Sequence, residues 1–331
     1  MTPHFKRHSW AVPSAVAVLL LALPAALSPY TQDMVVRIAI YAIFALSLEL
    51  LVGITGLVSL GHAAFLGIGA YVTVLASGDS GGSIARIAPL AVLAAAGYAL
   101  FVGALSLRTK GVYFIMVTLA FAQMAYFVFH DTKLAGGSDG IFLYVKPVLA
   151  LGGQTVLNLD DKHHAYYSVI GCLVGTYALL ALLRRSRFGH ALDGIRVNEP
   201  RMRAAGYSTY GYKLAAFVIA GALAGLAGFL LAAKDGVCNP ELLSWHESGA
   251  VLLMIILGGI GSLRGAVIGA VAFTLLKELF QSEALLGSLA GHWQMTLGFT
   301  IIAFVALLPK GLIGLRTRLL GAPAPWVIPC P

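Results

Sequence analysis

Long apolar runs separated by short polar segments make up most of this chain. Each run is close to the length of about 20 residues at which an α-helix crosses a bilayer with its backbone hydrogen bonds closed internally. The pattern therefore predicts an all-α polytopic membrane protein with about ten transmembrane helices, organised as a single membrane domain over residues 1–331. The predicted spans are residues 10–28, 35–54, 58–77, 86–106, 112–129, 165–183, 214–233, 242–258, 263–280 and 292–308.

The composition excludes a water-soluble fold. Hydrophobic residues make up 59% of the 331 positions and charged residues 11%, whereas a soluble domain carries about 25% charged residues. A globule of this size cannot bury so much apolar surface, but a bilayer accepts it as helices.

The basic residues indicate which side of the membrane each segment faces. With the N-terminus inside, most of the 22 Lys and Arg fall in inside segments, and cytoplasmic loops carry such an excess. The net charge of +8 then reflects membrane topology and does not indicate nucleic acid. We expect residues 1–9 and 309–331 to be cytoplasmic, with an even number of crossings that depends on the run 242–258. The outside loops hold Lys133, Lys146, Lys162 and Lys234.

Two polar segments are longer than connectors need to be. Residues 130–164 form the longest outside loop, which we expect in the periplasm, and residues 184–213 form a long inside loop. In the inside loop, Ser186 is placed to cap one short amphipathic helix and Asn198 to cap a second. Gly206 falls just past the expected end of the second helix.

Glycine-rich breaks precede two of the predicted helices, and each break is followed by a serine that is placed to cap the helix, Ser59 in one case and Ser262 in the other. Transporters use broken helices to direct N-terminal dipoles at a substrate carboxylate. Both breaks also fall near the inside face, where they could be simple turns. The two readings stay open at this point. The glycines concerned are Gly53, Gly56, Gly258, Gly259 and Gly261.

Glycines also recur at spacings that let transmembrane backbones approach closely, which predicts helix packing. Glu49 is a carboxylate well inside a span, which suggests a functional site, a structural hydrogen bond or a protonated carboxyl. His62 and Gln123 are weaker candidates of the same kind. The repeated glycines are Gly171 and Gly175; Gly221, Gly225 and Gly228; and Gly261, Gly265 and Gly269.

The sequence predicts neither a catalytic constellation nor a metal site. Its cysteines, Cys172, Cys238 and Cys330, follow no metal-ligand spacing and fall in different compartments of the expected topology. It has no GxxxxGK[ST] phosphate-binding loop, so we expect no cofactor bound by this chain. If ATP drives the protein, another chain binds it.

Three blocks of the sequence resemble a known family. The blocks run over Tyr41–Tyr71 (YAIFALSLELLVGITGLVSLGHAAFLGIGAY), Ser186–Ala232 and Met254–Ala270 (MIILGGIGSLRGAVIGA). They resemble the branched-chain amino acid ABC transporter permeases of the LivH/LivM family, in particular the LivM type. The chain departs from the family at Glu49, where the family commonly has asparagine, so no role for Glu49 can be carried over.

The resemblance implies a bacterial inner-membrane importer with the vitamin B12-importer-type permease fold. It implies a LivH-like second permease subunit, two cytoplasmic ABC ATPase subunits that use ATP, and a periplasmic substrate-binding protein; a homodimer of permeases stays open. A cytoplasmic permease loop contacts the ATPase in such importers. The apolar face of this permease loop would fill a groove on the ATPase or lie against the membrane domain. The match places this loop at residues 184–213, with Arg187, Phe188, Gly189, Leu192, Ile195, Arg196, Glu199, Arg201, Ala205 and Gly206 as its candidate coupling residues. Arg203 would join the other loop arginines in meeting acidic or backbone acceptors.

The substrate stays open at this stage. Alternatives are an ABC permease for urea, short amides or other amino acids, and an ion-coupled secondary transporter with Glu49 as its proton or cation site. An intramembrane enzyme is disfavoured because no paired catalytic groups lie in the spans. The candidate pathway residues are Glu49, Ser59, His62, Gln123 and Ser262.

Overall fold

The computed structural model describes residues 28–78, 82–132, 136–151, 154–282, 291–308 and 311–314. Residues 10–27 of the predicted first span, the N-terminal residues 1–9 and most of the predicted tail 309–331 lie outside these ranges. The elements are α2 (Pro29–Glu49), the π-helix η3 (Leu50–Thr55), α3 (His62–Ser77), α4 (Ile84–Ser106), α5 (Val112–Asp131), the 3-10 helix η5 (Gly137–Asp139), β1 (Ile141–Phe142), β2 (Val148–Leu151), β3 (Gln154–Asn158), α6 (Lys162–Arg185), α7 (Arg187–Val197), α8 (Glu199–Ala204), α9 (Thr209–Asp235), β4 (Val237–Cys238), the 3-10 helix η6 (Pro240–Leu243), α10 (Trp245–Gly258), α11 (Leu263–Gln281) and α13 (Trp293–Leu307).

The protein is a polytopic, mainly α-helical membrane protein. Within the described residues, 6 helical segments are long and apolar enough to cross a membrane, or up to 7 if a bent pair is counted as one span. The 58–77 run is the shorter helix α3. The 242–258 and 263–280 runs, expected as separate crossings, are α10 and α11, which bend by 116° at the break between them. The count of about ten stays a prediction.

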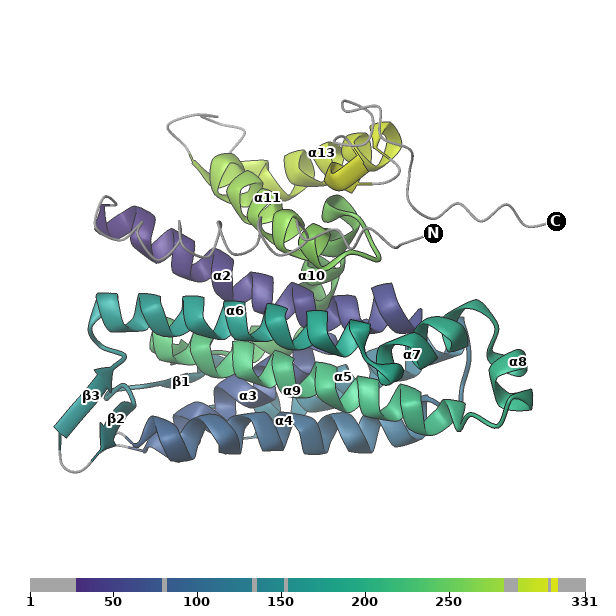
Figure 1. The fold of residues 1–331 in the computed structure, drawn as a ribbon. Helices are drawn as coiled ribbons and strands as arrows, with labels where there is room; N and C mark the ends of the chain where they lie inside the picture. Colours follow the sequence, from purple (N-terminus) through teal and green to yellow (C-terminus); the bar gives the residue numbers. More distant parts are fainter. Residues whose placement is uncertain are drawn as a thin grey trace, which may run out of the picture.

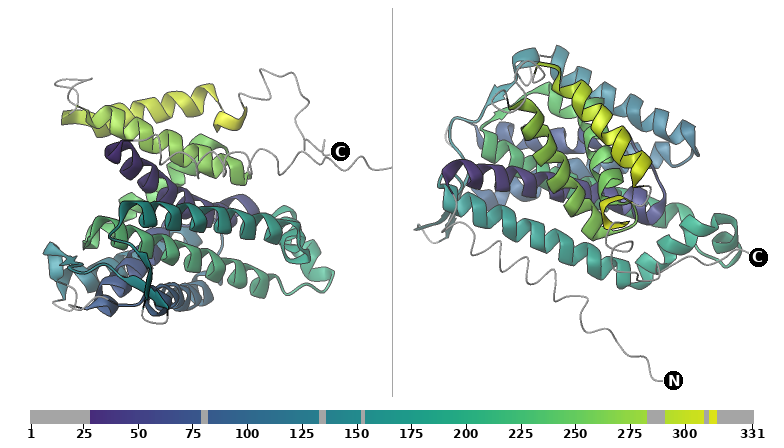
Figure 2. Two further views of the ribbon diagram at one scale, coloured as in Figure 1. Left: turned by 60° about the vertical axis from the view of Figure 1, so that its left-hand side comes forward. Right: turned by 90° about the horizontal axis from the view of Figure 1, so that it is seen from above.

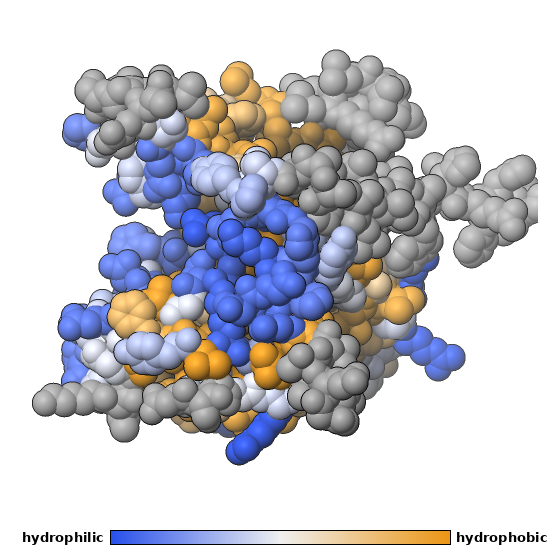
Figure 3. All heavy atoms as spheres, turned by 90° about the vertical axis from the view of Figure 1, so that its left-hand side faces the viewer, coloured by the Kyte–Doolittle hydropathy of each residue, from blue (hydrophilic) through white to orange (hydrophobic). Residues whose placement is uncertain are grey.

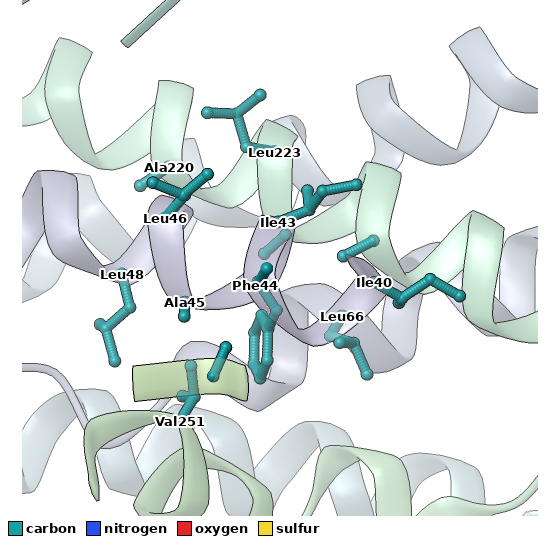
Figure 4. Close-up of a cluster of buried hydrophobic side chains, with 14 of the residues drawn as sticks. Ile40, Ile43, Phe44, Ala45, Leu46, Leu48, Leu66, Ala220, Leu223 and Val251 are labelled. Carbon is teal, nitrogen blue, oxygen red and sulfur yellow. The ribbon is translucent and has the colours of Figure 1, made fainter. Parts of the chain in front are cut away.

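Helix α2 lies at the centre of the fold. The layer of α3, α4, α6 and α9 packs on one side of it, and α10, α11 and α13 lie on the other (Figure 1 and Figure 2). Its side chains from Ile40 to Leu48 meet Leu66 of α3, Leu223 of α9 and Val251 of α10 (Figure 4). Outer helices such as α5 instead expose large apolar side chains, as a surface in contact with lipid requires.

The two ends of the bundle differ in structure. The short helices α7 and α8 lie at one end and the strands β2 and β3 at the other (Figure 1). The predicted outside loop 130–164 is more structured than its turn residues indicated, because β1 pairs with β4 and β2 pairs with β3. Figure 3 shows that this end has a hydrophilic centre with hydrophobic flanks.

Close helix packing at glycine is confirmed for two of the three repeats. A Cβ on Gly225 would meet the Cβ of Ala95, one on Gly228 would meet the backbone of α3, and one on Gly269 would meet the carbonyl of Met254. By contrast, a Cβ on Gly171 or Gly175 would meet nothing within 4 Å. The spacing of that pair therefore predicted an interface that the described chain does not contain, since the repeat shows only that α6 has a small-residue face and not which helix packs on it.

Candidate functional site

Helices α7 and α8 form the loop that the sequence singled out. Ser186 Oγ accepts a hydrogen bond from the Gly189 amide at 3.3 Å, and Asn198 Oδ1 accepts one from the Arg201 amide at 3.0 Å. Both predicted caps are confirmed. Gly189 has no space for a side chain beside the Leu183 and Arg184 carbonyls, and Gly206 follows α8 with a φ of 87°. The loop therefore has a defined shape set by local backbone rules.

The apolar face of α7 lies against the membrane domain of the same chain. Leu192 and Ile195 are 0% and 3% exposed, and Phe188 stacks on Tyr212 of α9 with ring centroids 5.5 Å apart. The sequence left open whether this apolar face fills a groove on an ATPase or lies against the membrane domain. The structure shows the contact with the membrane domain. Movement of α7 must shift the residues on which it is packed, because packed interiors have few voids.

Glu199 fastens α8 to the start of α9. Its Oε1 accepts hydrogen bonds from Arg203 Nη2 at 2.7 Å and Thr209 Oγ1 at 3.1 Å, and its Oε2 accepts one from Lys213 Nζ at 2.6 Å. Partial desolvation acts to raise the pKa of Glu199, but the hydrogen bond and charge of Lys213, with the bonds from Arg203 and Thr209, outweigh it and hold the pKa at about 2. Glu199 is thus an internal clamp of the loop.

We expect Glu199→Gln to loosen α8 by about 1–3 kcal/mol, because the negative charge and one of the two acceptor oxygens are lost. The pKa in the folded loop lies below its ordinary value of 4.5, so the stabilisation is present above that pH and is lost as the pH falls toward 2. A spin label at Ala205→Cys, in a background without the native cysteines, should gain mobility on acidification. In Glu199→Gln it should be mobile at neutral pH already, whereas Asp193→Asn should match the wild type. An equally immobile label in Glu199→Gln would contradict the clamp.

The loop arginines divide into inward and outward groups. Arg196 donates from Nη1 to the Gly53 carbonyl of η3, and Arg203 binds Glu199. The side chains of Arg187 and Arg201 are exposed, and no hydrogen bond or ion pair ties either side chain to another described residue. Ala205 and Gly206 are exposed beside them. The surface available to a partner is therefore the outward face of α8 and the start of α7.

Glu49 is fully buried where α2 passes into the π-helix. Its Oε1 accepts a hydrogen bond at 2.7 Å from the amide of Gly261, in the break before α11. The Ser262 hydroxyl caps α11 by accepting from the Gly265 amide at 3.2 Å, as predicted. The sequence suggested that this break could receive a substrate carboxylate. In the structure, a carboxylate of the same chain is bound there.

The remaining pathway candidates do not form one site. His62 is buried, with Nε2 at 2.8 Å from Ser47 Oγ. The prediction that Ser59 caps α3 is wrong, because the helix begins at His62 and Ser59 accepts instead from the Gly61 amide at 3.2 Å. Gln123 lies half-buried on α5, and no hydrogen bond in the described chain joins it to the others.

Ser248 of α10 was missed by the sequence analysis. Its Oγ accepts from the Ala63 amide in the first turn of α3 at 2.9 Å. Amides in the first turn of a helix have no acceptor within the helix, and a local N-cap side chain usually accepts from one of them. Here Ser248 supplies that acceptor from another helix. The two residues are far apart in the sequence, so no local spacing could have indicated the contact.

Comparison with known families identifies the chain. The model of the branched-chain amino acid transport system / permease component family matches residues 30–307. The chain belongs to this family. The chain is similar to the high-affinity branched-chain amino acid transport system permease protein LivM of Escherichia coli K12, to which it is 30% identical over 318 residues, covering 90% of this chain and 73% of LivM. LivH of the same organism is 25% identical over 290 residues, covering 83% of this chain and 91% of LivH.

A more distant similarity is to the xylose permease XylH of Haemophilus influenzae, which is 30% identical over 136 residues, covering 40% of this chain and 36% of XylH. No solved structure matches the chain. Family membership and the apolar helices together make this permease-family chain a multi-pass protein of the bacterial inner membrane.

Proposed function

We propose that this chain is the LivM-like permease subunit of an ATP-binding-cassette importer that moves branched-chain amino acids across the inner membrane. The observation that carries the proposal is the family match over residues 30–307, together with 30% identity to LivM over 90% of the chain. The two-helix loop supports it, because a permease without its own ATPase site must receive force from another chain.

The proposed assembly contains a LivH-like second permease subunit, two cytoplasmic ABC ATPases and a periplasmic substrate-binding protein. ATP is bound by the ATPases and no cofactor by this chain. We place residues 184–213 at the ATPases and residues 130–164 toward the binding protein. The full fold is proposed to have about ten helices of the vitamin B12-importer type, with residues 1–9 and 309–331 in the cytoplasm, as the distribution of basic residues supports.

The mechanism is alternating access, in which two global states expose the substrate site to opposite sides. Closure of the ATPases on ATP displaces α7 and α8 through the outward face that holds Arg187 and Arg201. The buried contacts of Leu192 and Ile195 then pass this displacement to the membrane helices. For the substrate we propose a path beside α2, α3 and α10, where Ser47 contacts His62 and Ser248 accepts from the neighbouring Ala63 amide.

Dependence of transport on partner ATPases separates this proposal from a secondary transporter. The chain is co-expressed with candidate ABC ATPases, a candidate second permease and a candidate binding protein, purified by a tag on this chain and reconstituted in liposomes. The proposal expects the ATPases to co-purify with this chain. It also expects uptake to require ATP on the side of the liposome membrane that the ATPases face. Uptake driven by an ion gradient alone, without ATP, would overturn it.

A further inference from the structure

Arg196 fastens the coupling helix α7 to the inner end of the central helix. Its guanidinium donates to the Gly53 carbonyl within η3. Its side-chain stem lies against Gly56, the residue with a φ of 73° that ends the π-helix, so that a Cβ there would be 3.2 Å from Arg196 Cγ. Hydrogen bonds from a charged donor are among the stronger ones in proteins. Displacement of α7 therefore acts directly on the backbone of η3.

Gly53 also faces the Glu49 carboxyl. A Cβ on Gly53 would collide with the carboxyl carbon and Oε1 of Glu49, so the missing side chain makes the space in which the carboxylate lies. The segment between them is wound as a π-helix, a form that occurs mainly as short bulges and frequently at functional sites. The peptide that accepts from Arg196 is thus in contact with the group that binds the next element.

That next element is the elbow between α10 and α11. The Gly261 amide donates to Glu49 Oε1 at 2.7 Å, and Gly259 and Gly261 have φ angles of 114° and 91° that favour glycine. Helices α10 and α11 are packed backbone to backbone at the elbow, because a Cβ on Gly258 would meet the Gly265 carbonyl. A shift of the elbow therefore moves α10 and α11 together.

From these contacts we propose that Arg196, Gly53 and Glu49 form a relay, named here the elbow relay, that transmits displacement of α7 to the α10–α11 elbow. Its members are positioning residues for transport and contact neither substrate nor ATP. The inference rests on the proposed function and adds to it the route by which the coupling loop reaches the bent helix pair. It also explains how a buried carboxylate is retained in a span, since it binds the elbow amide.

The test measures leucine imported per ATP hydrolysed by the reconstituted complex with its binding protein. Glu49→Ala removes the acceptor and is expected to lower this ratio about tenfold, the scale of one lost hydrogen bond. Glu49→Gln keeps an acceptor oxygen and should stay within about twofold of the wild type. Glu278→Ala removes a carboxylate from the other end of α11, where it accepts from Tyr30, and should leave the ratio unchanged.

A double-mutant cycle with Gly53→Ala tests whether the residues act as one relay. The added methyl displaces the Glu49 carboxyl, so the single variant should match Glu49→Ala. In the double variant there is no carboxyl to displace, so Gly53→Ala should have no further effect. Arg196→Ala combined with Glu49→Ala should likewise be no worse than the stronger single variant.

Two outcomes would overturn the elbow relay while the proposed function stands: a wild-type ratio in Glu49→Ala, or effects that multiply in the double variants. If the ratio of Glu49→Ala is unchanged while its melting temperature is lower, the first of these outcomes also shows that Glu49 has a purely structural role. Absence of ATP-dependent uptake in the wild-type complex would overturn the proposed function, and the relay with it.

Discussion

Replacement of Gly228 by leucine is expected to abolish the folded permease. Gly228 lies on α9 where α3 crosses it, and a Cβ there would collide with the Leu66 carbonyl and approach the Ala70 amide at 2.9 Å. Both are backbone atoms, which cannot rotate away as a side chain can. Overpacking of a well-packed core costs about 1–3 kcal/mol, and a collision with backbone atoms of a neighbouring helix belongs at or above the top of that range.

The measurement is the yield of monodisperse protein in mild detergent after membrane extraction, which should fall at least about tenfold. The matched control is Gly171→Leu, which makes the same change inside the apolar helix α6 at a position where a Cβ meets nothing within 4 Å. That variant should give the wild-type yield. Equal yields for both variants would show that the close approach of α3 and α9 is not required for folding.

Charge reversal of Arg201 is expected to detach the ATPases without unfolding the permease. Arg201 is exposed on α8, and no hydrogen bond or ion pair ties its side chain to another described residue. Its backbone amide completes the Asn198 cap, which does not depend on the side chain. Mutation of a charge at an interface changes association through electrostatic complementarity and should weaken binding to an acidic acceptor.

We expect Arg201→Glu to lower ATPase co-purification at least about tenfold, with an additional loss on combination with Arg187→Glu. Arg86→Glu is the control, because Arg86 is also exposed but lies in the first turn of α4, at the membrane side that we assign to the periplasm. It should retain the ATPases. Normal co-purification and normal uptake in the Arg187→Glu/Arg201→Glu double variant would contradict the assignment of the outward loop face.

Local rules predicted the structure of the α7–α8 loop well. Ser186 and Asn198 each cap a helix, and Gly206 follows the second, because an N-cap needs only one side chain and an amide two or three residues later. The apolar positions of α7 showed which face is buried. The surface against which that face packs is set by η3 and α9, and could not be derived from the pattern within the loop.

The buried polar contacts could not be predicted for the same reason. Glu49 and Gly261 are brought together by the packing of α2 against α11, and Ser248 reaches the first turn of α3 from α10. The Ser59 prediction failed because a serine after a glycine-rich break can bond an amide before the helix begins. Hydropathy located the apolar segments, but it does not report the 116° bend that joins α10 to α11.

The most direct test of the account is uptake of labelled leucine, urea and a short amide by the complete complex with its own binding protein, in parallel assays with and without ATP. We predict ATP-dependent uptake of leucine that unlabelled isoleucine and valine suppress, and no uptake of urea or the amide above background. ATP-dependent uptake of urea or the amide without uptake of leucine would contradict the branched-chain amino acid assignment.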